Sequence, residues 1–122
     1  MTDVAADVAA REGLGALTMA SVAGTLGVSV PSLYKHVAGL DGMRRLLTLR
    51  STDELATAVT GAVLGRSGRD ALVPICHAYR GFAQRHPGRY AATVRAPASD
   101  DAEHLAAAER VLVPVLAVIT GY

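Results

Sequence analysis

Three consecutive polar side chains, Tyr34, Lys35 and His36, lie shortly after a proline at the start of a short predicted helix. A phenol or an imidazole can donate a hydrogen bond to a phosphate oxygen, and a lysine can reach acceptors on base edges in the major groove. This group is therefore a candidate for contact with DNA. The alternative is a plain helical hairpin in which Tyr34 is half-buried and His36 lies on the surface.

A second set of side chains could bind a small molecule. Aromatic or polarisable residues recur at helical spacing before the HPGRY segment and once within it, and some carry polar tips that could orient a ligand. We expect these residues to line the space between the later helices: Cys76, Tyr79, Phe82 and Tyr90. The same spacing is also typical of an ordinary helical core.

Motifs for catalysis or metal binding are missing from the sequence. The stretch "GLGALT" has two glycines but no third glycine and no preceding strand, so it is not a dinucleotide-binding loop. G-x-S-x-G, H-E-x-x-H and P-loop patterns do not occur. The single cysteine, Cys76, excludes an internal disulfide framework and a four-cysteine zinc site. We expect no enzymatic activity, no cofactor and no metal.

Helical periodicity runs through the chain, and no stretch alternates with period two for long enough to predict a strand. We therefore expect an all-α fold. Glycines, prolines and candidate caps divide the chain into seven predicted helices, which begin near Val4, Thr18, Ser29 or Val30, Asp41, Ser67, the HPGRY segment and Ala102. Pro74 and Pro114 fall inside the fifth and seventh predicted helices, and each should kink its helix.

Tyr34, Lys35 and His36 lie on the second of two predicted helices that together span residues 18–37. Gly27 can adopt the left-handed conformation that ends the first helix. The turn "GVS" has the three residues typical of a helix-turn-helix. Val28 and Leu33 occupy the two positions of a hydrophobic staple, which would fix the angle at which the chain enters the second helix.

The cap of the second helix has two candidates, Ser29 and Val30. If Ser29 is the cap, its hydroxyl must reach the amide of Ser32, because Pro31 has no N–H. Val30 is the alternative, because a residue before proline is disfavoured in helical geometry. In either case a proline in the first turn sacrifices no hydrogen bond of the helix, since amides there lack partners within the helix.

A helix-turn-helix projects the first residues of its second helix into the major groove. We expect the residues that face bases to be Val30, Pro31, Ser32 and Lys35, and we expect Ser29 to belong to the same DNA-binding surface. Tyr34 and His36 should face phosphates, and Thr18, at the start of the preceding helix, can add a hydroxyl and backbone donors.

Composition narrows the class of protein. Apolar residues make up 51% of the 122 residues, which is ample for a core, and the net charge is only +1. The first residues are acidic and alternate with alanine, which is unlike a signal peptide. The longest apolar run, "VLVPVLAVI", is far shorter than the ~20 residues that span a bilayer. We expect a cytoplasmic protein with no membrane partner.

The stretch "LTMASVAGTLGVSVPSLYKHVAGLDGMRRLL" resembles the DNA-binding segment of TetR-type transcriptional regulators. The stretch "HAYRGFAQRHPGRY" is similar to the ligand domain of a subgroup with an HPGRY-like segment. The resemblance implies a helix-turn-helix DNA-binding domain over residues 1–50 and a helical ligand-binding and dimerisation domain over residues 51–122. It also implies a homodimer on a palindromic operator in double-stranded DNA, acting as a repressor that a small-molecule effector releases.

Carried onto this sequence, the family's phosphate contacts fall on Thr18, Tyr34 and His36. Many relatives have a phosphate-binding lysine just before the cap of the fourth helix, where this sequence has Leu40. We expect Arg44 and Arg45, one turn later, to replace it. Family members usually continue with two further helices that build the dimer interface, so we expect the sequence to be truncated at its C-terminus.

A second departure concerns direct reading of bases. Val30 stands where an arginine-like residue is common in the family, so Lys35 and Ser32 are the main candidates for polar base contacts. Val30 and Pro31 could still press against a thymine methyl group. These departures leave open an alternative function, a helical module that binds small molecules or proteins and no longer reads DNA.

Overall fold

The computed structural model describes residues 2–13, 17–66 and 69–120. These residues form seven α-helices and no strand, which confirms the predicted all-α fold. The helices are α1 (Thr2–Glu12), α2 (Met19–Leu26), α3 (Val30–Tyr34), α4 (Gly39–Val63), α5 (Arg69–Arg85), α6 (Pro87–Thr93) and α7 (Ala102–Thr120). The predicted cap Ser67 lies outside the described residues.

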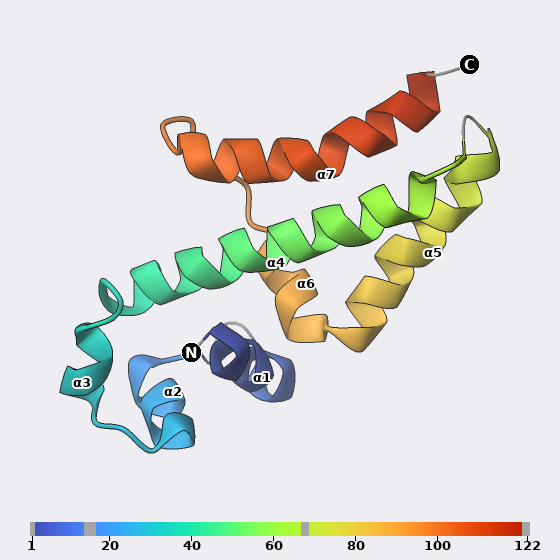
Figure 1. The fold of residues 1–122 in the computed structure, drawn as a ribbon. Helices are drawn as coiled ribbons and strands as arrows, with labels where there is room; N and C mark the ends of the chain where they lie inside the picture. The colour runs from blue at the N-terminus through green and yellow to red at the C-terminus, as the bar shows by residue number, and fades with distance from the viewer. Residues whose placement is uncertain (1, 14–16, 67–68, 121–122) are drawn as a thin grey trace.

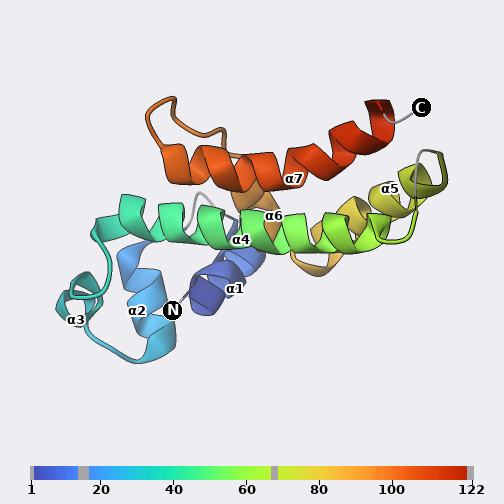
Figure 2. The same cartoon turned by 45° about the horizontal axis from the view of Figure 1, so that its top comes forward.

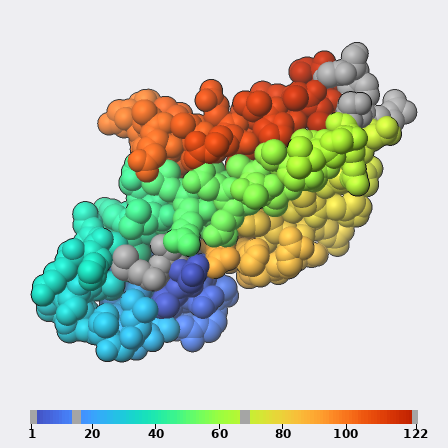
Figure 3. Space-filling view, in the orientation of Figure 1, coloured from blue at the N-terminus to red at the C-terminus, as the bar shows by residue number. Residues whose placement is uncertain are grey.

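The long helix α4 is the axis around which the other helices are arranged (Figure 1). Helices α1 to α3 gather near its N-terminal end, α5 and α6 lie on one side of its remaining length, and α7 lies along the other side (Figures 1 and 2). The space-filling view shows α7 running beside α4 over most of its length (Figure 3). Helix α4 therefore connects the helix-turn-helix to the rest of the molecule.

Buried side chains form two clusters, and α4 contributes to both. The first cluster joins α1, α2, α3 and the start of α4, where Met43 and Leu47 are almost completely buried. The second joins α4 to α5 and α7 and includes Leu55 and Val59 of α4. Because one helix enters both clusters, a tilt of α4 within the second cluster would displace the first. The domain boundary at residue 50 remains a prediction.

The start of α4 differs from the prediction. The helix begins at Gly39, and its N-cap is Ala38, which makes no side-chain capping hydrogen bond. Asp41, the predicted cap, lies instead in the first turn, where its carboxylate interacts favourably with the positive end of the helix dipole. Gly39 has a φ of +73°, a left-handed conformation that favours glycine. This conformation lets the chain turn sharply from α3 into α4.

The HPGRY segment forms the start of α6 and attaches it to two other helices. Gly88 is buried against α1, and a Cβ atom at this position would lie 2.4 Å from the carbonyl oxygen of Ala6. The guanidinium of Arg89 forms ion pairs with Asp3 of α1 at 2.9 Å and with Glu54 of α4 at 3.3 Å. The close approach at Gly88 and the two ion pairs fix α6 against both α1 and α4.

Two prolines lie inside helices, as the sequence predicted: Pro74 in α5 and Pro114 in α7. The kinks expected from them stay predictions. None of the helices in the described part of the chain combines the length and the apolar composition needed to cross a membrane.

Candidate DNA-binding surface and effector region

Helix α2 is anchored at its start by a reciprocal pair of hydrogen bonds. Thr18 Oγ1 accepts a hydrogen bond from the amide of Ser21 at 3.0 Å, and Ser21 Oγ accepts one from the amide of Thr18 at 3.0 Å. Thr18 is therefore the N-cap that the sequence predicted. Its hydroxyl acts only as an acceptor in this pair, so the hydroxyl proton of this exposed residue is available to donate to a phosphate.

The turn between α2 and α3 consists of Gly27, Val28 and Ser29. Gly27 has a φ of +74°, which confirms the predicted left-handed end of α2. The amide of Val28 donates to the carbonyl of Ala23 at 3.1 Å and so closes the last turn of α2. Val28 is 46% exposed, whereas Leu33 is buried in the first cluster, so little of the predicted staple between them is buried.

Ser29, not Val30, is the cap of α3. Ser29 Oγ accepts a hydrogen bond from the amide of Ser32 at 3.3 Å and donates one to Ser32 Oγ at 2.9 Å. Pro31 lies between them in the first turn, where its missing N–H leaves no partner unsatisfied. The proton of Ser32 Oγ remains available to a base or a phosphate.

Helix α3 is shorter than predicted. It ends at Tyr34, and the amides of Lys35 and His36 close a tighter turn on the carbonyls of Ser32 and Leu33. Lys35 and His36 thus lie immediately after the helix, not within it, although both are exposed. The predicted extension to Val37 is wrong because that residue is buried in the first cluster and turns the chain toward α4.

The outward surface of this segment is formed by the polar side chains that the sequence singled out. Tyr34 is 54% exposed, and its ring lies over Gly39 at the start of α4, because a Cβ there would be 3.6 Å from Tyr34 Cε1. Pro31 is exposed, whereas Val30 is only partly accessible and packs against the first cluster. Of the four residues expected to face bases, Val30 and Ser32 are therefore less accessible than Pro31 and Lys35.

The two arginines of α4 have different environments. The guanidinium of Arg45 donates from Nε and Nη2 to the two carboxylate oxygens of Asp101, at 3.1 Å and 3.0 Å. Glu103 lies 3.7 Å from Nη1 of the same side chain. Arg44 is partly buried, and its Nε has no hydrogen-bond partner among the described residues. In this structure Arg45 is therefore bound to Asp101 at the start of α7. Its predicted contact with a DNA phosphate would require this ion pair to break.

Asp101 is a residue that the sequence interpretation missed. Its Oδ1 also accepts a hydrogen bond from the amide of His104 at 3.0 Å, which caps the start of α7. The hydrogen bond from Arg45 and then the one from the His104 amide lower the pKa of Asp101 below its ordinary value. The loop "APASDD" contains two adjacent aspartates, and sequence alone could not show which of them pairs with α4.

Three of the four predicted effector residues lie together, and one does not. Phe82 is buried in the second cluster, and Tyr79 and Tyr90 pack partly buried against it. Burial, and then the proximity of Tyr90, raise the pKa of Tyr79. Cys76 is exposed, so the prediction that it lines the interior with the others is wrong. Its neighbour Ile75 takes the inward position on α5.

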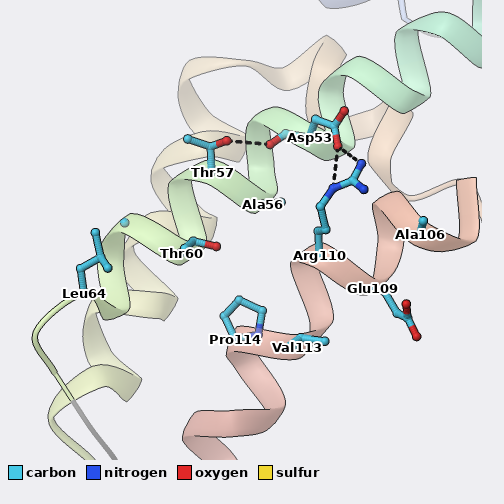
Figure 4. A pocket seen from close by; sticks show the side chains of 11 residues that line it. Asp53, Ala56, Thr57, Thr60, Leu64, Ala106, Glu109, Arg110, Val113 and Pro114 are labelled. Atoms are coloured by element: carbon cyan, nitrogen blue, oxygen red, sulfur yellow. Dashed lines mark hydrogen bonds and ion pairs between the residues drawn. The ribbon is translucent and has the colours of Figure 1, made fainter. Parts of the chain in front are cut away.

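A large open groove lies elsewhere, between α4 and α7 (Figure 4). It encloses about 1040 Å³, and an ion pair between Arg110 and Asp53 connects its two walls. The remaining lining is mostly small or apolar: Ala56, Thr57, Thr60, Gly61, Leu64, Ala106, Glu109, Val113 and Pro114. None of the four residues predicted to bind an effector lines this groove.

Two segments of the chain match models of known families. Residues 1–37 match the model described as bacterial regulatory proteins of the tetR family. Residues 72–122 match the model of a tetracyclin repressor-like C-terminal domain. The first matched segment includes the helix-turn-helix, and the second includes α7, which forms one wall of the groove.

Two bacterial relatives align over most of the chain. The uncharacterized HTH-type transcriptional regulator Rv0681 of Mycobacterium tuberculosis is 41% identical over 113 residues, which are 92% of this chain and 52% of the relative. The uncharacterized HTH-type transcriptional regulator YobS of Bacillus subtilis is 34% identical over 94 residues, which are 77% of this chain and 49% of the relative. The chain thus spans about half the length of these relatives.

The fold is similar to one solved by crystallography. The structure of the protein SCO4313 superimposes with a TM-score of 0.75, covering 96% of this chain and 58% of that one. The sequence identity is 23%, so the likeness concerns the arrangement of the helices and not the chemistry of any site.

Proposed function

The chain belongs to the TetR family of bacterial regulatory proteins, and on that premise we propose that it is a DNA-binding transcriptional regulator. The observation that carries the proposal is the exposed polar edge of a correctly capped helix-turn-helix. Leu33 is buried beneath α3, while Tyr34, Lys35 and His36 point away from the core and are free to reach a duplex. A plain helical hairpin would also leave polar groups exposed here, so the match of residues 1–37 to the tetR family model is what favours DNA binding over that alternative.

The side chains divide by the part of the DNA that each can reach. Thr18, Tyr34 and His36 are proposed to hold phosphates, which fixes the position of α3 but carries no sequence information. Lys35 and Ser32 are proposed to read base edges, and Pro31 to contact a thymine methyl group. We call the segment from Ser29 to His36 the reading head. Two polar base contacts per reading head distinguish only modestly between DNA sequences. Much of the affinity should therefore come from phosphate contacts and from a second copy of the chain on the same DNA.

We propose a homodimer on a palindromic operator with half-sites about 34 Å apart, one turn of the duplex. The outer face of α7 supports this assembly, because it exposes a row of large apolar side chains: Leu105, Leu112, Leu116 and Ile119. An apolar face of this kind is typical of an interface between subunits.

We propose that the protein acts in the cytoplasm, where bacterial DNA lies.

Control by a small molecule is proposed to act through α4. A molecule bound among α4 to α7, either in the α4/α7 groove or beside Tyr79 and Tyr90, would favour one tilt of α4 over another. Since α4 also enters the first cluster, the tilt would change the distance between the two reading heads of a dimer. Release from the operator, and hence repression in the absence of the effector, follows if the bound state no longer fits both half-sites.

The experiment that tests DNA binding uses the purified protein, the DNA upstream of its own gene and fluorescence anisotropy over a range of salt concentrations. Affinity should fall steeply with salt. Tyr34→Ala should weaken binding by about tenfold, and Tyr34→Phe should show how much of that loss belongs to the hydroxyl. Arg80→Gln, a change of an exposed arginine on α5, is the control and should bind normally.

Equal binding by wild type and Tyr34→Ala, or binding that is insensitive to salt, would contradict this proposal. That result would favour the alternative of a helical module that no longer reads DNA.

A further inference from the structure

A small polar cavity lies where α4 meets the loop between α6 and α7 and the first turn of α7. It encloses about 150 Å³, and its polar lining consists of Arg45, Thr48, Arg95, Asp101 and His104. It shares no lining residue with the α4/α7 groove, and it contains none of the residues predicted to contact an effector. It is therefore a separate candidate site.

The inner wall of this cavity has two side chains that are almost completely buried. Thr48 is 3% exposed and His104 is 6% exposed. Neither the Thr48 hydroxyl nor the His104 imidazole has a hydrogen bond to another described residue. Polar groups buried to this degree normally have a partner. Both groups line the cavity, so both can donate a hydrogen bond to whatever occupies it.

The charges around the cavity favour an anion. Asp101 is the only acidic residue of the lining, and both of its oxygens are bound by Arg45, with Oδ1 also accepting from the His104 amide. Arg95 is exposed at the mouth and forms no ion pair with a described residue. Glu103 lies outside the lining but 3.7 Å from Arg45, so Arg45 is balanced by carboxylates, whereas Arg95 is the charge of the lining without an acidic partner among the described residues. The positive end of the α7 dipole adds to the charge of Arg95.

The size of the cavity limits its occupant to a few atoms. At about 30 Å³ per water molecule, it has room for roughly five waters or for an ion of similar size. We propose that this cavity binds a small oxyanion, either inorganic phosphate or the carboxylate group of a small organic acid. Arg95 would bind two oxygens of the anion from the mouth, and Thr48 and His104 would donate from the inner wall.

A bound anion would also hold three segments together, because its ligands come from α4, the loop after α6 and the start of α7. Thr48 belongs to α4, Arg95 follows α6, and His104 belongs to α7. An occupied cavity should therefore stabilise the folded chain in proportion to the logarithm of anion concentration above the dissociation constant.

The test is a titration of the purified ¹⁵N-labelled protein with sodium phosphate, sodium acetate or sodium chloride at constant ionic strength and pH. Amide shifts, the imidazole resonances of His104 and the thermal midpoint are followed together. We expect phosphate, acetate or both to give saturable shifts centred on Arg95 and His104, with a rise in the midpoint, and chloride to give neither. The two oxyanion arms show which chemistry the site prefers.

Variants locate the site. Arg95→Gln, a change of an exposed side chain that should fold normally, is expected to weaken anion binding by about tenfold. Thr48→Val removes the hydroxyl while keeping its volume and should weaken binding less. Arg80→Gln, which removes an exposed arginine remote from the cavity, should bind as wild type does.

The proposal fails if neither oxyanion gives saturable shifts at Arg95 and His104, if chloride reproduces them, or if Arg80→Gln weakens binding as much as Arg95→Gln. No DNA is present in this titration. Its failure would therefore leave the proposed regulator function intact, and loss of DNA binding would leave this site intact.

Discussion

The side chain of Arg45 illustrates how one long-range contact decides what a residue can do. Its position one turn into α4 predicted a phosphate contact, by analogy with relatives that have a lysine near this helix start. In the structure its guanidinium instead donates to both oxygens of Asp101, a residue 56 positions later in the chain. Such a pair, partly exposed, adds only modestly to stability, but its two parallel hydrogen bonds fix the direction of the side chain.

The same pair predicts a dependence of stability on pH. The pKa of Asp101 is lowered in the folded state by Arg45 and by the His104 amide. The stabilisation is therefore present above the ordinary pKa of 3.8 and is lost as the pH falls through the lower folded-state value. Asp101→Asn keeps a capping side chain but removes the charge, so we expect it to be less stable than wild type at pH 7. This difference should shrink as the pH falls below 3.8 and disappear below the folded-state pKa.

Urea unfolding at several pH values between 7 and 3 measures this effect. Asp100→Asn is the matched control, because Asp100 is exposed and forms no ion pair with the described residues. A stability difference for Asp101→Asn that stays constant over this range would show that the aspartate acts only as a cap.

The N-cap of α3 could not be assigned from the sequence alone. Both Ser29 and Val30 were possible caps, and the structure selects Ser29 because its hydroxyl reaches the amide of Ser32 across the proline. A side-chain cap satisfies one of the free amides at a helix start, whereas Val30 has no oxygen to offer. The same choice places Val30 against the first cluster and reduces what it can present to DNA.

At the scale of elements, the start of α6 is held against α1 by the absence of a side chain at Gly88. A Cβ there would lie 2.4 Å from the Ala6 carbonyl oxygen and 2.7 Å from the Ala10 amide nitrogen, and backbone atoms cannot give way cheaply. We expect Gly88→Ala to destabilise the fold by about 1–3 kcal/mol because α6 must move away from α1.

Gly61→Ala is the control, and it should change the stability of the fold in the opposite direction. Gly61 lies inside α4, and a Cβ there would meet nothing within 4 Å, so alanine should stabilise the helix by about 0.5–1 kcal/mol. Urea midpoints of the two variants and of wild type measure both changes. Equal midpoints for Gly88→Ala and wild type would mean that α1 and α6 can separate without cost.

The short length of α3 has a consequence for the reading head. Five residues form too short a helix to be stable alone, so its position depends on Leu33 in the first cluster, on the Ser29 cap and on the turn at Gly39. Lys35 and His36 follow the helix in a tighter turn. Their directions are therefore set by the chain entering α4 as well as by α3 itself.

At the scale of the whole molecule, the exposed row on α7 predicts self-association. Leu112 is 51% exposed, so Leu112→Glu should change the stability of the single chain little while placing a charge in the proposed interface. We expect the dimer dissociation constant to rise at least about tenfold. Analytical ultracentrifugation measures this constant directly.

Val94→Glu is the control for this prediction, because Val94 is 68% exposed at the end of α6 and lies outside the row on α7. A wild-type chain that remains monomeric at high concentration, or equal weakening by Val94→Glu, would contradict the assignment of the dimer interface to α7.

Local chemistry made much of the fold predictable from the sequence. Period-3.6 patterning gave the all-α class, and Thr18 and Gly27 marked the two ends of α2 because a threonine cap and a left-handed glycine are decided within a few residues. The polar residues 34–36 were singled out from the sequence for the same reason, and their contact with DNA stays a prediction. The ends of α3 and α4 were less predictable, because burial of Val37 and the turn at Gly39 depend on packing.

Contacts between distant segments were decided only by the tertiary structure. The pairing of Arg45 with Asp101, the groove between α4 and α7 and the small cavity beside His104 all join α4 to residues about 50 positions later. Periodicity shows which face of a helix is apolar, but not which helix covers it or at what angle. The sequence by itself therefore determined the all-α class and the helix ends that are decided within a few residues, whereas side-chain packing around α4 decided which polar groups stay free to bind.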